Sequence, residues 1–399
     1  MNDAAPGPEP PPVPPLPVLR GGNAENYPAS PEYLLSARNP SGRVVTECVA
    51  AHSGDAAVQA LRGRGYTDIV LHTDDVAAVY TRHSKVAKRI SPREYVAFRR
   101  RQSLLARVFF TTRKIYAAGW WVYVLLAAFF TLLWAMRQPW GMWGYVAAFY
   151  LAYPPVYALG AQLFSPARRY HRLLEAAGWG RWDEVLRLIP ALAAKGLPDD
   201  LAFREAQALA GLGRLDEALE RVRPFANDFH PPAWLYQERL AEVYLAAHRP
   251  DAYLACLERA LELAPENPTV LLDAALGRLR WRQRDAVAGA RALIERAETH
   301  AISDGLAPFL DYAGGVLALE QGDAATARHR LEEAMRKYAS LHFSNPLLSL
   351  VEDHVHAYLA LACAAEGDQT AAAEHFRRAE PRLRALAMDD LIARCQAAL

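Results

Sequence analysis

Two long stretches without charged side chains follow each other in this chain of 399 residues. Residues 115–136 and 142–164 contain no Asp, Glu, Lys or Arg, and Arg137 is the one charged residue in the break between them. A helix needs about 20 apolar residues to cross the hydrocarbon core of a bilayer, and both stretches reach that length. The sequence therefore predicts two transmembrane helices, which form a hairpin over residues 115–164.

Basic residues flank both outer ends of this predicted hairpin. Residues 81–114 are rich in Lys and Arg, and Arg168, Arg169 and Arg172 follow the second stretch. Positive charge favours the cytoplasmic side of a membrane, so we expect a protein of the inner (cytoplasmic) membrane with both termini in the cytoplasm. Within the basic juxtamembrane segment, residues 99–114 have two interpretations. They lie on the anionic leaflet as an interfacial helix, or they only supply the charge that sets the topology.

Pro154 and Pro155 fall inside the second stretch and predict a kink. Prolines are tolerated in a membrane helix where neighbouring groups bond the backbone carbonyls that they leave free. Neither stretch contains an ionisable acid or base of the kind that marks transport and proton pathways. We therefore interpret the hairpin as an anchor rather than a channel or transporter.

The chain before the hairpin divides into a tail and a small domain. Residues 1–29 include the run PGPEPPPVPPLP and no apolar signal-peptide core, which predicts a disordered, Pro-rich tail. Residues 30–80 predict a small α+β domain of order ββαβ, with strands near 33–37, 43–49 and 67–72 and a helix that Ser53 caps. A unit this small has little core of its own, so we expect it to pack on another part of the protein.

This small domain resembles the short N-terminal module of type II secretion and pilus inner-membrane platform proteins. The matching positions are Tyr33, Ala37, Gly42, Val49, Ala50, Ser53, Ala56, Leu61 and Gly65. The helical bundle of those platform proteins does not follow in this chain. The resemblance therefore implies no function for this chain. It leaves one alternative hypothesis, in which the protein is an assembly component of a secretion or pilus machine.

His72, Thr73, Asp74 and Asp75 form a polar cluster after the third predicted strand. A histidine beside two carboxylates is able to bind a metal or to transfer a proton. The structural alternative is a strand end, followed by Thr73 or Asp74 as the N-cap of a helix over residues 75–80. We favour the cap, because no second cluster supplies further ligands.

Residues 165–399 contain a recurring turn between helices. The sequences GRWDEV, GRLDEA, GDAATA and GDQTAA begin at Gly180, Gly213, Gly322 and Gly367. In each, a Gly ends one helix and a small or apolar residue five positions later lets the next helix approach closely. Gly180 and Gly213 are 33 residues apart.

This pattern resembles the tetratricopeptide repeat (TPR), whose period is about 34 residues. The clearest unit has Leu240, Ala241, Tyr244, Ala260 and Pro265 at the positions that the family uses, while His248 replaces the usual turn glycine. The resemblance implies a TPR-like α-solenoid in which neighbouring helix pairs stack, so that the fold class of the whole chain is mainly α.

The concave face of such a solenoid is lined by the first helix of each pair. Alignment of the repeats places the following residues there: Tyr170, Phe203, Gln207, Glu238, Glu242 and Tyr312. A groove of aromatic rings and carboxylates suits an apolar or basic peptide helix. In the alternative interpretation, the aromatic residues belong to the core between repeats.

These features favour a membrane-anchored scaffold that presents a cytoplasmic TPR-like solenoid to a protein or peptide partner. No catalytic motif is recognised, so we expect no enzyme and no cofactor. An enzyme with an unrecognised site around residues 72–75 is the remaining alternative. The balance of 45 basic and 44 acidic residues gives no electrostatic argument for nucleic acid as a partner.

Overall fold

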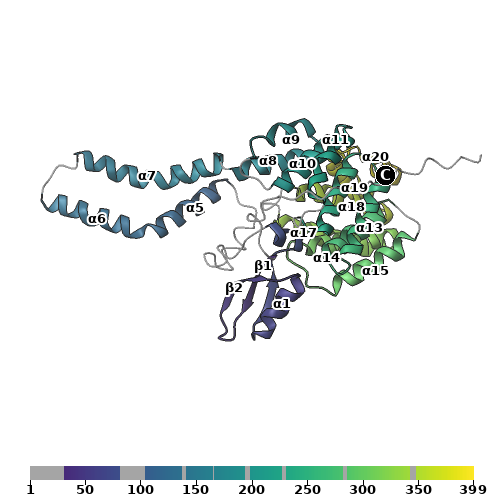
Figure 1. Cartoon of the computed structure of the whole chain (residues 1–399), viewed down its shortest axis with the longest axis horizontal. Coiled ribbons are helices and arrows are strands. Elements are labelled where there is room, and N and C mark those ends of the chain that lie inside the picture. The colour runs from purple at the N-terminus through teal and green to yellow at the C-terminus, as the bar shows by residue number, and fades with distance from the viewer. Residues whose placement is uncertain are drawn as a thin grey trace, which may run out of the picture.

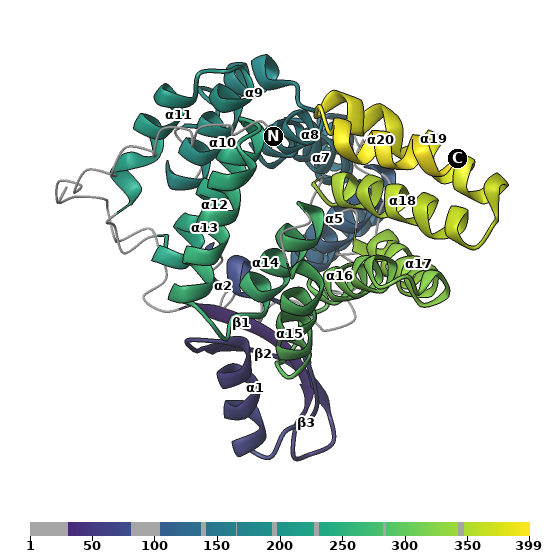
Figure 2. The same cartoon turned by 90° about the vertical axis from the view of Figure 1, so that its right-hand side faces the viewer.

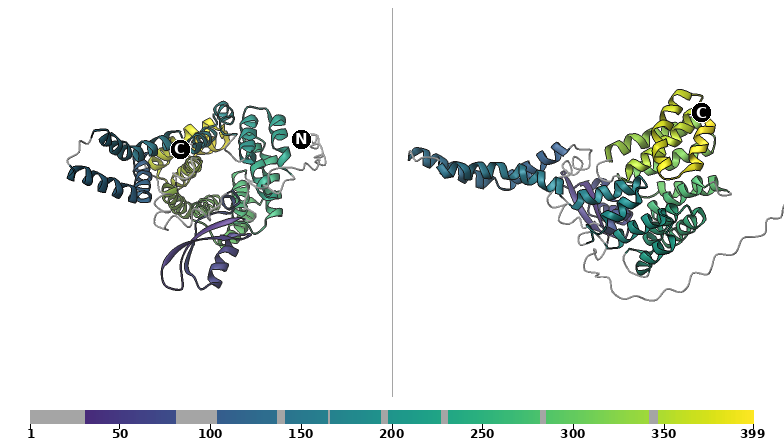
Figure 3. Two further views of the ribbon diagram at one scale, coloured as in Figure 1. Left: turned by 60° about the vertical axis from the view of Figure 1, so that its left-hand side comes forward. Right: turned by 90° about the horizontal axis from the view of Figure 1, so that it is seen from above.

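The computed structural model describes residues 31–80, 104–136, 141–164, 166–193, 198–226, 231–281, 285–341 and 347–399. Within these residues the protein is mainly helical, with one small antiparallel sheet near the N-terminus. The helices form a body from which the sheet and a long helical hairpin project in different directions (Figures 1 and 3). The predicted tail over 1–29 and most of the basic segment over 81–114 lie outside the described residues.

The small N-terminal unit has the predicted order ββαβ. Its elements are β1 (Glu32–Arg38), β2 (Val44–Ala50), α1 (Gly54–Gly63), β3 (Thr67–Leu71) and α2 (Asp75–Tyr80). The sheet order is β2-β1-β3, with both neighbouring pairs antiparallel. Ser53 caps α1 as predicted, because its hydroxyl accepts a hydrogen bond from the Ala56 amide at 3.2 Å. Tyr33, Leu35 and Leu61 form the centre of a small core between sheet and helix.

This unit packs on the helical body, as its small core led us to expect. It contacts the loop over residues 299–306, between two helices of the body. The Asp304 amide donates to the Leu71 carbonyl at 3.0 Å, which extends the hydrogen bonding beyond the end of β3. The Ala301 amide donates to the Asp55 carboxylate at 2.6 Å. The loop over residues 299–306 is therefore the docking site of the small unit.

The projecting hairpin consists of α5 (Leu104–Ala118), α6 (Trp120–Ala135) and α7 (Gly141–Phe164). The prediction of one continuous helix over residues 115–136 is wrong. The helix is interrupted at Gly119, between α5 and α6, because glycine is unfavourable in a helix interior. Taken one at a time, the helices of the described residues are too short or not apolar enough to cross a membrane. Thr111–Ala117 and Trp120–Ala135 meet both criteria together, across a bend of 65°.

Antiparallel helix pairs build the body. The first helices of the pairs are α8 (Pro166–Gly178), α10 (Pro198–Gly211), α12 (Ala233–Ala246), α14 (Pro268–Arg280), α16 (Ala307–Glu320) and α18 (Leu348–Ala365). Their partners are α9 (Trp182–Leu188), α11 (Leu215–Val222), α13 (Pro250–Leu263), α15 (Ala286–Glu298), α17 (Ala324–Leu341) and α19 (Gln369–Ala385), and α20 (Asp389–Ala398) follows.

The turns within these pairs follow the sequence pattern closely. All four predicted turn glycines have a positive φ, between +63° at Gly180 and +84° at Gly367. His248 takes the same left-handed conformation with φ at +53°, although a side chain makes this conformation costly. The residue after His248, Arg249, donates its amide to the Tyr244 carbonyl at 2.9 Å, which is the bond that closes a Schellman turn.

The array of helix pairs curves until its last pair meets its first (Figure 2). Arg382 on α19 donates from Nη1 to the Gly178 carbonyl at the end of α8, at 2.8 Å. The Arg382 side chain is buried at this contact, although 204 positions separate the two residues. The helical body is thus a closed ring, and the first helices of the pairs face its interior.

Candidate functional site

A cavity of about 370 Å³ lies in the interior of the ring. Its wall includes Gln207 from α10, Glu242 from α12, Arg280 from α14 and Tyr358 from α18. Trp182 and the α19–α20 turn complete it, so helices from both ends of the repeat array contribute. The cavity therefore depends on closure of the ring.

Glu242, one of the six predicted groove residues, is held by two arginines. Its carboxylate accepts from Nη1 of Arg204 at 3.0 Å and from Nη1 of Arg239 at 2.8 Å. Burial opposes ionisation of Glu242, but the charges of Arg239 and Arg204 outweigh burial and lower the pKa of this carboxyl. Gln207 joins the same network, since its amide oxygen accepts from Arg204 at 3.0 Å. Both predicted residues line the cavity, with their polar groups already engaged.

Tyr170 belongs to this charged network at its α8 end. Its hydroxyl donates to the Asp200 carboxylate at 2.6 Å, and burial followed by the Asp200 charge raises the pKa of the phenol. Asp200 in turn lies 4.0 Å from Nε of Arg204. A polar chain therefore runs along the inside of the first three helix pairs.

Glu238 and Asp273 form an acidic pair on α12 and α14. Burial, followed by the charge of Glu242, raises the pKa of Asp273 to about 7. Burial and the neighbouring Asp273 raise the pKa of Glu238 well above its ordinary value. Within the described residues, Oε1 of Glu238 has no hydrogen-bond partner. At neutral pH these two groups carry much less negative charge than the sequence suggests.

The two remaining predicted groove residues are buried aromatic rings. Phe203 packs edge-to-face on Tyr236, with ring centres 5.4 Å apart. Tyr312 packs on Tyr358 with ring centres 5.9 Å apart. Both rings fit the alternative interpretation, in which aromatic residues fill the core between helix pairs.

The polar cluster at residues 72–75 supports the fold. Asp74 accepts from the Ala77 amide at 2.6 Å, so it is the N-cap of α2. His72 bonds outward to Asp304 at 2.6 Å, and Asp75 accepts from the hydroxyl of Tyr33. Within the described residues, no group of three or more His, Cys, Asp or Glu side chains is arranged to hold a metal ion.

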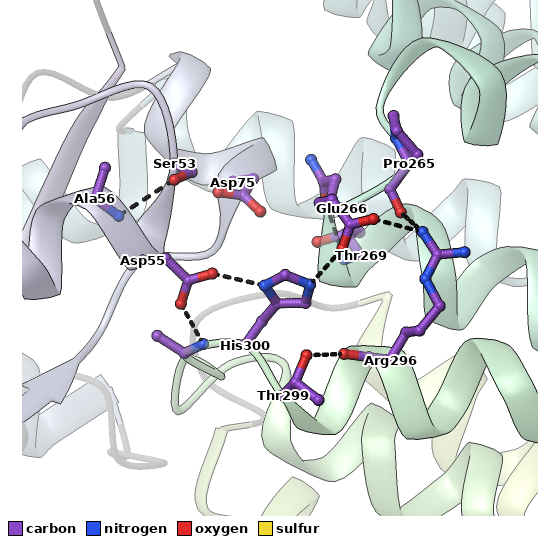
Figure 4. A network of polar contacts seen from close by, with 12 residues as sticks. Ser53, Asp55, Ala56, Asp75, Pro265, Glu266, Thr269, Arg296, Thr299 and His300 are labelled. Carbon is purple, nitrogen blue, oxygen red and sulfur yellow. Dashed lines mark hydrogen bonds and ion pairs between the residues drawn. The ribbon is translucent and has the colours of Figure 1, made fainter.

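A second polar network joins the small unit to the helical body (Figure 4). Asp55 faces the His300 ring, with 2.6 Å between its carboxylate and Nδ1. Glu266 lies 3.2 Å from the other ring nitrogen and also binds Arg296 at 2.7 Å. A cavity of about 510 Å³ adjoins this network.

Sequence reasoning missed the arginines of the inner wall. Arg204 and Arg239 stand on first helices, three positions before the cavity-lining residues Gln207 and Glu242, and Arg280 on α14 lines the cavity itself. That spacing is a usable signal, because residues three or four apart share a helix face. No protein-family model and no curated protein matches the chain.

Proposed function

We propose that this protein is a membrane-anchored scaffold. In this proposal the hairpin α5–α7 inserts into the inner membrane, and both termini stay in the cytoplasm. The ring of helix pairs is a TPR-like solenoid that binds a protein or peptide partner. The left-handed turns and the paired helices support the TPR-like interpretation.

The exposure of the hairpin carries the membrane part of the proposal. No residue of α6 is buried, and Trp121, Leu125 and Leu132 are each more than half exposed. On α7, Phe149 and Val156 are 63% and 65% exposed. An apolar surface of this extent is costly in water, whereas the hydrocarbon of a bilayer covers it without that cost.

The two prolines of α7 add a second argument. In a helix the amide of each residue bonds the carbonyl four positions earlier, so Pro154 and Pro155 leave the carbonyls of Tyr150 and Leu151 free. Tyr116 donates its hydroxyl to the Leu151 carbonyl at 2.5 Å. Tyr123 lies 3.5 Å from the Tyr150 carbonyl. Water satisfies such carbonyls on a soluble helix, so their pairing inside the hairpin is most valuable where water is absent.

Membrane retention tests the anchor. The wild-type chain is expected to stay in the membrane fraction after a carbonate wash. Leu125→Arg places a charge in the middle of α6 at a cost of about 3 kcal/mol in a bilayer, and should shift the chain toward the soluble or aggregated fraction. Leu212→Arg, at an exposed apolar position between α10 and α11, is the matched control. Carbonate extraction of the wild-type chain contradicts the anchor.

Site-specific crosslinking tests the scaffold. A photoreactive amino acid at Gln207, in the cavity wall, is expected to give a defined protein adduct in native membranes. The same group at Glu295, exposed on the outer helix α15, is expected to give none. Equal adducts at both positions argue against a partner site on the inner face.

A further inference from the structure

Three arginines line the ring cavity, and within the described residues two of them, Arg280 and Arg249, form no ion pair. Glu242 is engaged by Arg204 and Arg239, and Arg394 pairs with Glu320. Arg278, on the same helix as Arg280, forms two hydrogen bonds with Glu258. Within the described part of the chain, no carboxylate forms an ion pair with Arg280.

The immediate surroundings of Arg280 are aromatic. Its guanidinium carbon lies 5.1 Å from the centre of the Trp281 ring, and its charge acts on Tyr253 and Tyr358. Burial, followed by the charge of Arg280, lowers the pKa of His354 to about 3. His354 is therefore neutral, and its Nδ1 donates to the Leu350 carbonyl at 2.8 Å. Arg394 and Glu320 also act on Tyr358, and these two side chains pair with each other.

The rim of the cavity carries charge of both signs. Asp389 and Asp390 are exposed in the first turn of α20, and Arg249 is exposed at the start of α13. Two rim carboxylates disfavour a ligand with several negative charges, such as a polyphosphate or nucleic acid. Apolar side chains in the lining of the cavity, including Trp182, Leu245 and Leu350, suit the uncharged body of a ligand.

We propose that the ring cavity is a binding site for a small organic acid, whose single carboxylate pairs with Arg280 and whose apolar or aromatic body packs against the tryptophan-lined wall. A cavity of about 370 Å³ falls in the range of small-molecule sites. A guanidinium offers paired donors that match a carboxylate, and such charge-assisted bonds are about twice as strong as neutral ones. This ligand site goes beyond the proposed scaffold function, which places a protein partner on the same inner face of the ring, and the two are tested by different readouts.

The site also has a consequence for the ring. Its wall includes Ala177 and Trp182 near the start of the repeat array and Leu386 and Leu391 near its end. A ligand in the cavity touches both sides of the closure and binds the closed form better than an open one. Ligand binding is therefore expected to stabilise the closed ring.

Calorimetric titration of the full-length chain in lipid nanodiscs tests this proposal. The probes are benzoate, 3-phenylpropionate and hexanoate, each matched with its neutral carboxamide. At least one acid is expected to bind, with its carboxamide at least tenfold weaker. Arg280→Gln should weaken acid binding at least tenfold and Arg280→Lys should restore part of it. Arg259→Gln, at an exposed position of α13 outside the cavity lining, should leave acid binding unchanged.

Three results overturn the proposal: no acid binds, acids and carboxamides bind equally, or Arg280→Gln binds like the wild-type chain. A fourth probe separates a small molecule from a partner protein. If acetyl-Ala-Ala-Ala-Phe with a free carboxylate binds and none of the small acids does, the cavity takes a peptide end instead. Membrane retention of Arg280→Gln, checked by carbonate wash, separates failure of this site from failure of the anchor.

Discussion

The guanidinium of Arg382 stacks on the indole of Trp179, with 3.9 Å between its central carbon and the ring centre. The same group donates to the Gly178 carbonyl at 2.8 Å and to the Asp353 carboxylate at 2.6 Å. One buried side chain thus links the first helix pair to the last pair, α18 and α19. The ring and its cavity depend on this contact.

Arg382→Ala is therefore expected to open the ring. Loss of the arginine leaves Asp353 without its cation, and burial already raises the pKa of that carboxyl. Removal of one partner from a largely buried ion pair costs about 3 kcal/mol. Chemical unfolding should report this loss, and small-angle X-ray scattering should show a larger maximum dimension.

Arg384→Ala is the matched control for ring opening. Arg384 is two positions away on α19, is exposed, and pairs with Glu380 one turn earlier. Such a surface pair contributes about 0.3–0.5 kcal/mol, so this variant should keep both stability and shape. Equal scattering curves for Arg382→Ala and the wild-type chain would show that the contact of Arg382 with Gly178 and Trp179 does not hold the ring closed.

Local structure could be predicted from this sequence because it depends on neighbouring residues. The alternation of apolar and polar residues in VVTECV predicted β2, and Ser53 predicted the start of α1. Gly213 and Gly322 predicted the left-handed turns. Closure of the ring could not be predicted, because Arg382 and Trp179 meet across more than half of the chain. No spacing rule links residues at that separation.

Two of the six predicted groove residues line the cavity, and the net charge of the groove could not be predicted from the sequence. Gln207 and Glu242 do line the ring interior. The sequence suggested a groove of aromatic rings and carboxylates for an apolar or basic peptide. Arg204 and Arg239 neutralise Glu242, however, and burial raises the pKa of Asp273 to about 7, so that this carboxyl is only partly ionised near neutral pH. The sign of the free charge depends on which side chains pair, and pairing across helices is a tertiary property.

Tyr116→Phe is expected to destabilise the hairpin in a bilayer. The Leu151 carbonyl, which Pro155 leaves free, then loses its hydroxyl donor. An unsatisfied buried acceptor costs about 1–3 kcal/mol. Thermal unfolding in nanodiscs should report the loss, while Tyr145→Phe, at a residue that is 80% exposed on α7, should have little effect.

A double-mutant cycle isolates this hydrogen bond. In Pro155→Ala the alanine amide bonds the Leu151 carbonyl within the helix, so the Tyr116 hydroxyl is no longer needed. Tyr116→Phe should then cost close to nothing in the Pro155→Ala background. If the cost is the same in both backgrounds, the hydroxyl does not serve the carbonyl that the proline leaves free.

The small N-terminal unit is expected to dock more weakly on the helical body when the two carboxylate–histidine contacts between them are weakened. In the double variant Asp55→Asn with Asp304→Asn, the charges that face His300 and His72 are removed. Hydrogen bonds to charged groups contribute about 1.5–3 kcal/mol each, so docking should weaken measurably. Hydrogen exchange at residues 67–75 and 299–306 should accelerate together.

Asp68→Asn controls for the change of a carboxylate within the small unit. Asp68 pairs with Arg38 on an exposed surface away from the docking loop. Asp68→Asn should leave hydrogen exchange at residues 299–306 unchanged. Unchanged exchange in the double variant indicates that backbone bonds and apolar contacts alone hold the unit in place.

His248→Gly and Ala387→Gly are each expected to stabilise the protein. Both residues have a positive φ, +53° and +49°, the conformation that Gly180, Gly213, Gly322 and Gly367 adopt in the turns within four other helix pairs. The left-handed conformation costs a non-glycine residue about 1–2 kcal/mol. Denaturant midpoints should rise for both variants, whereas Ala247→Gly, at a residue with a negative φ of −82°, should lower the midpoint.

Asp273 is expected to make the protein less stable as pH rises. Its pKa is raised to about 7 in the folded protein, so between pH 4 and 7 the folded state binds more protons than the unfolded state. Stability then falls with increasing pH across that window, by at most about 4 kcal/mol for a shift of three pH units. Asp273→Asn removes the titrating group, so denaturant unfolding at pH 5 and pH 8 should show a smaller difference for this variant than for the wild-type chain. Asp251→Asn, on the exposed face of α13, should keep the wild-type difference. If Asp273→Asn also keeps it, the carboxyl does not titrate in this range.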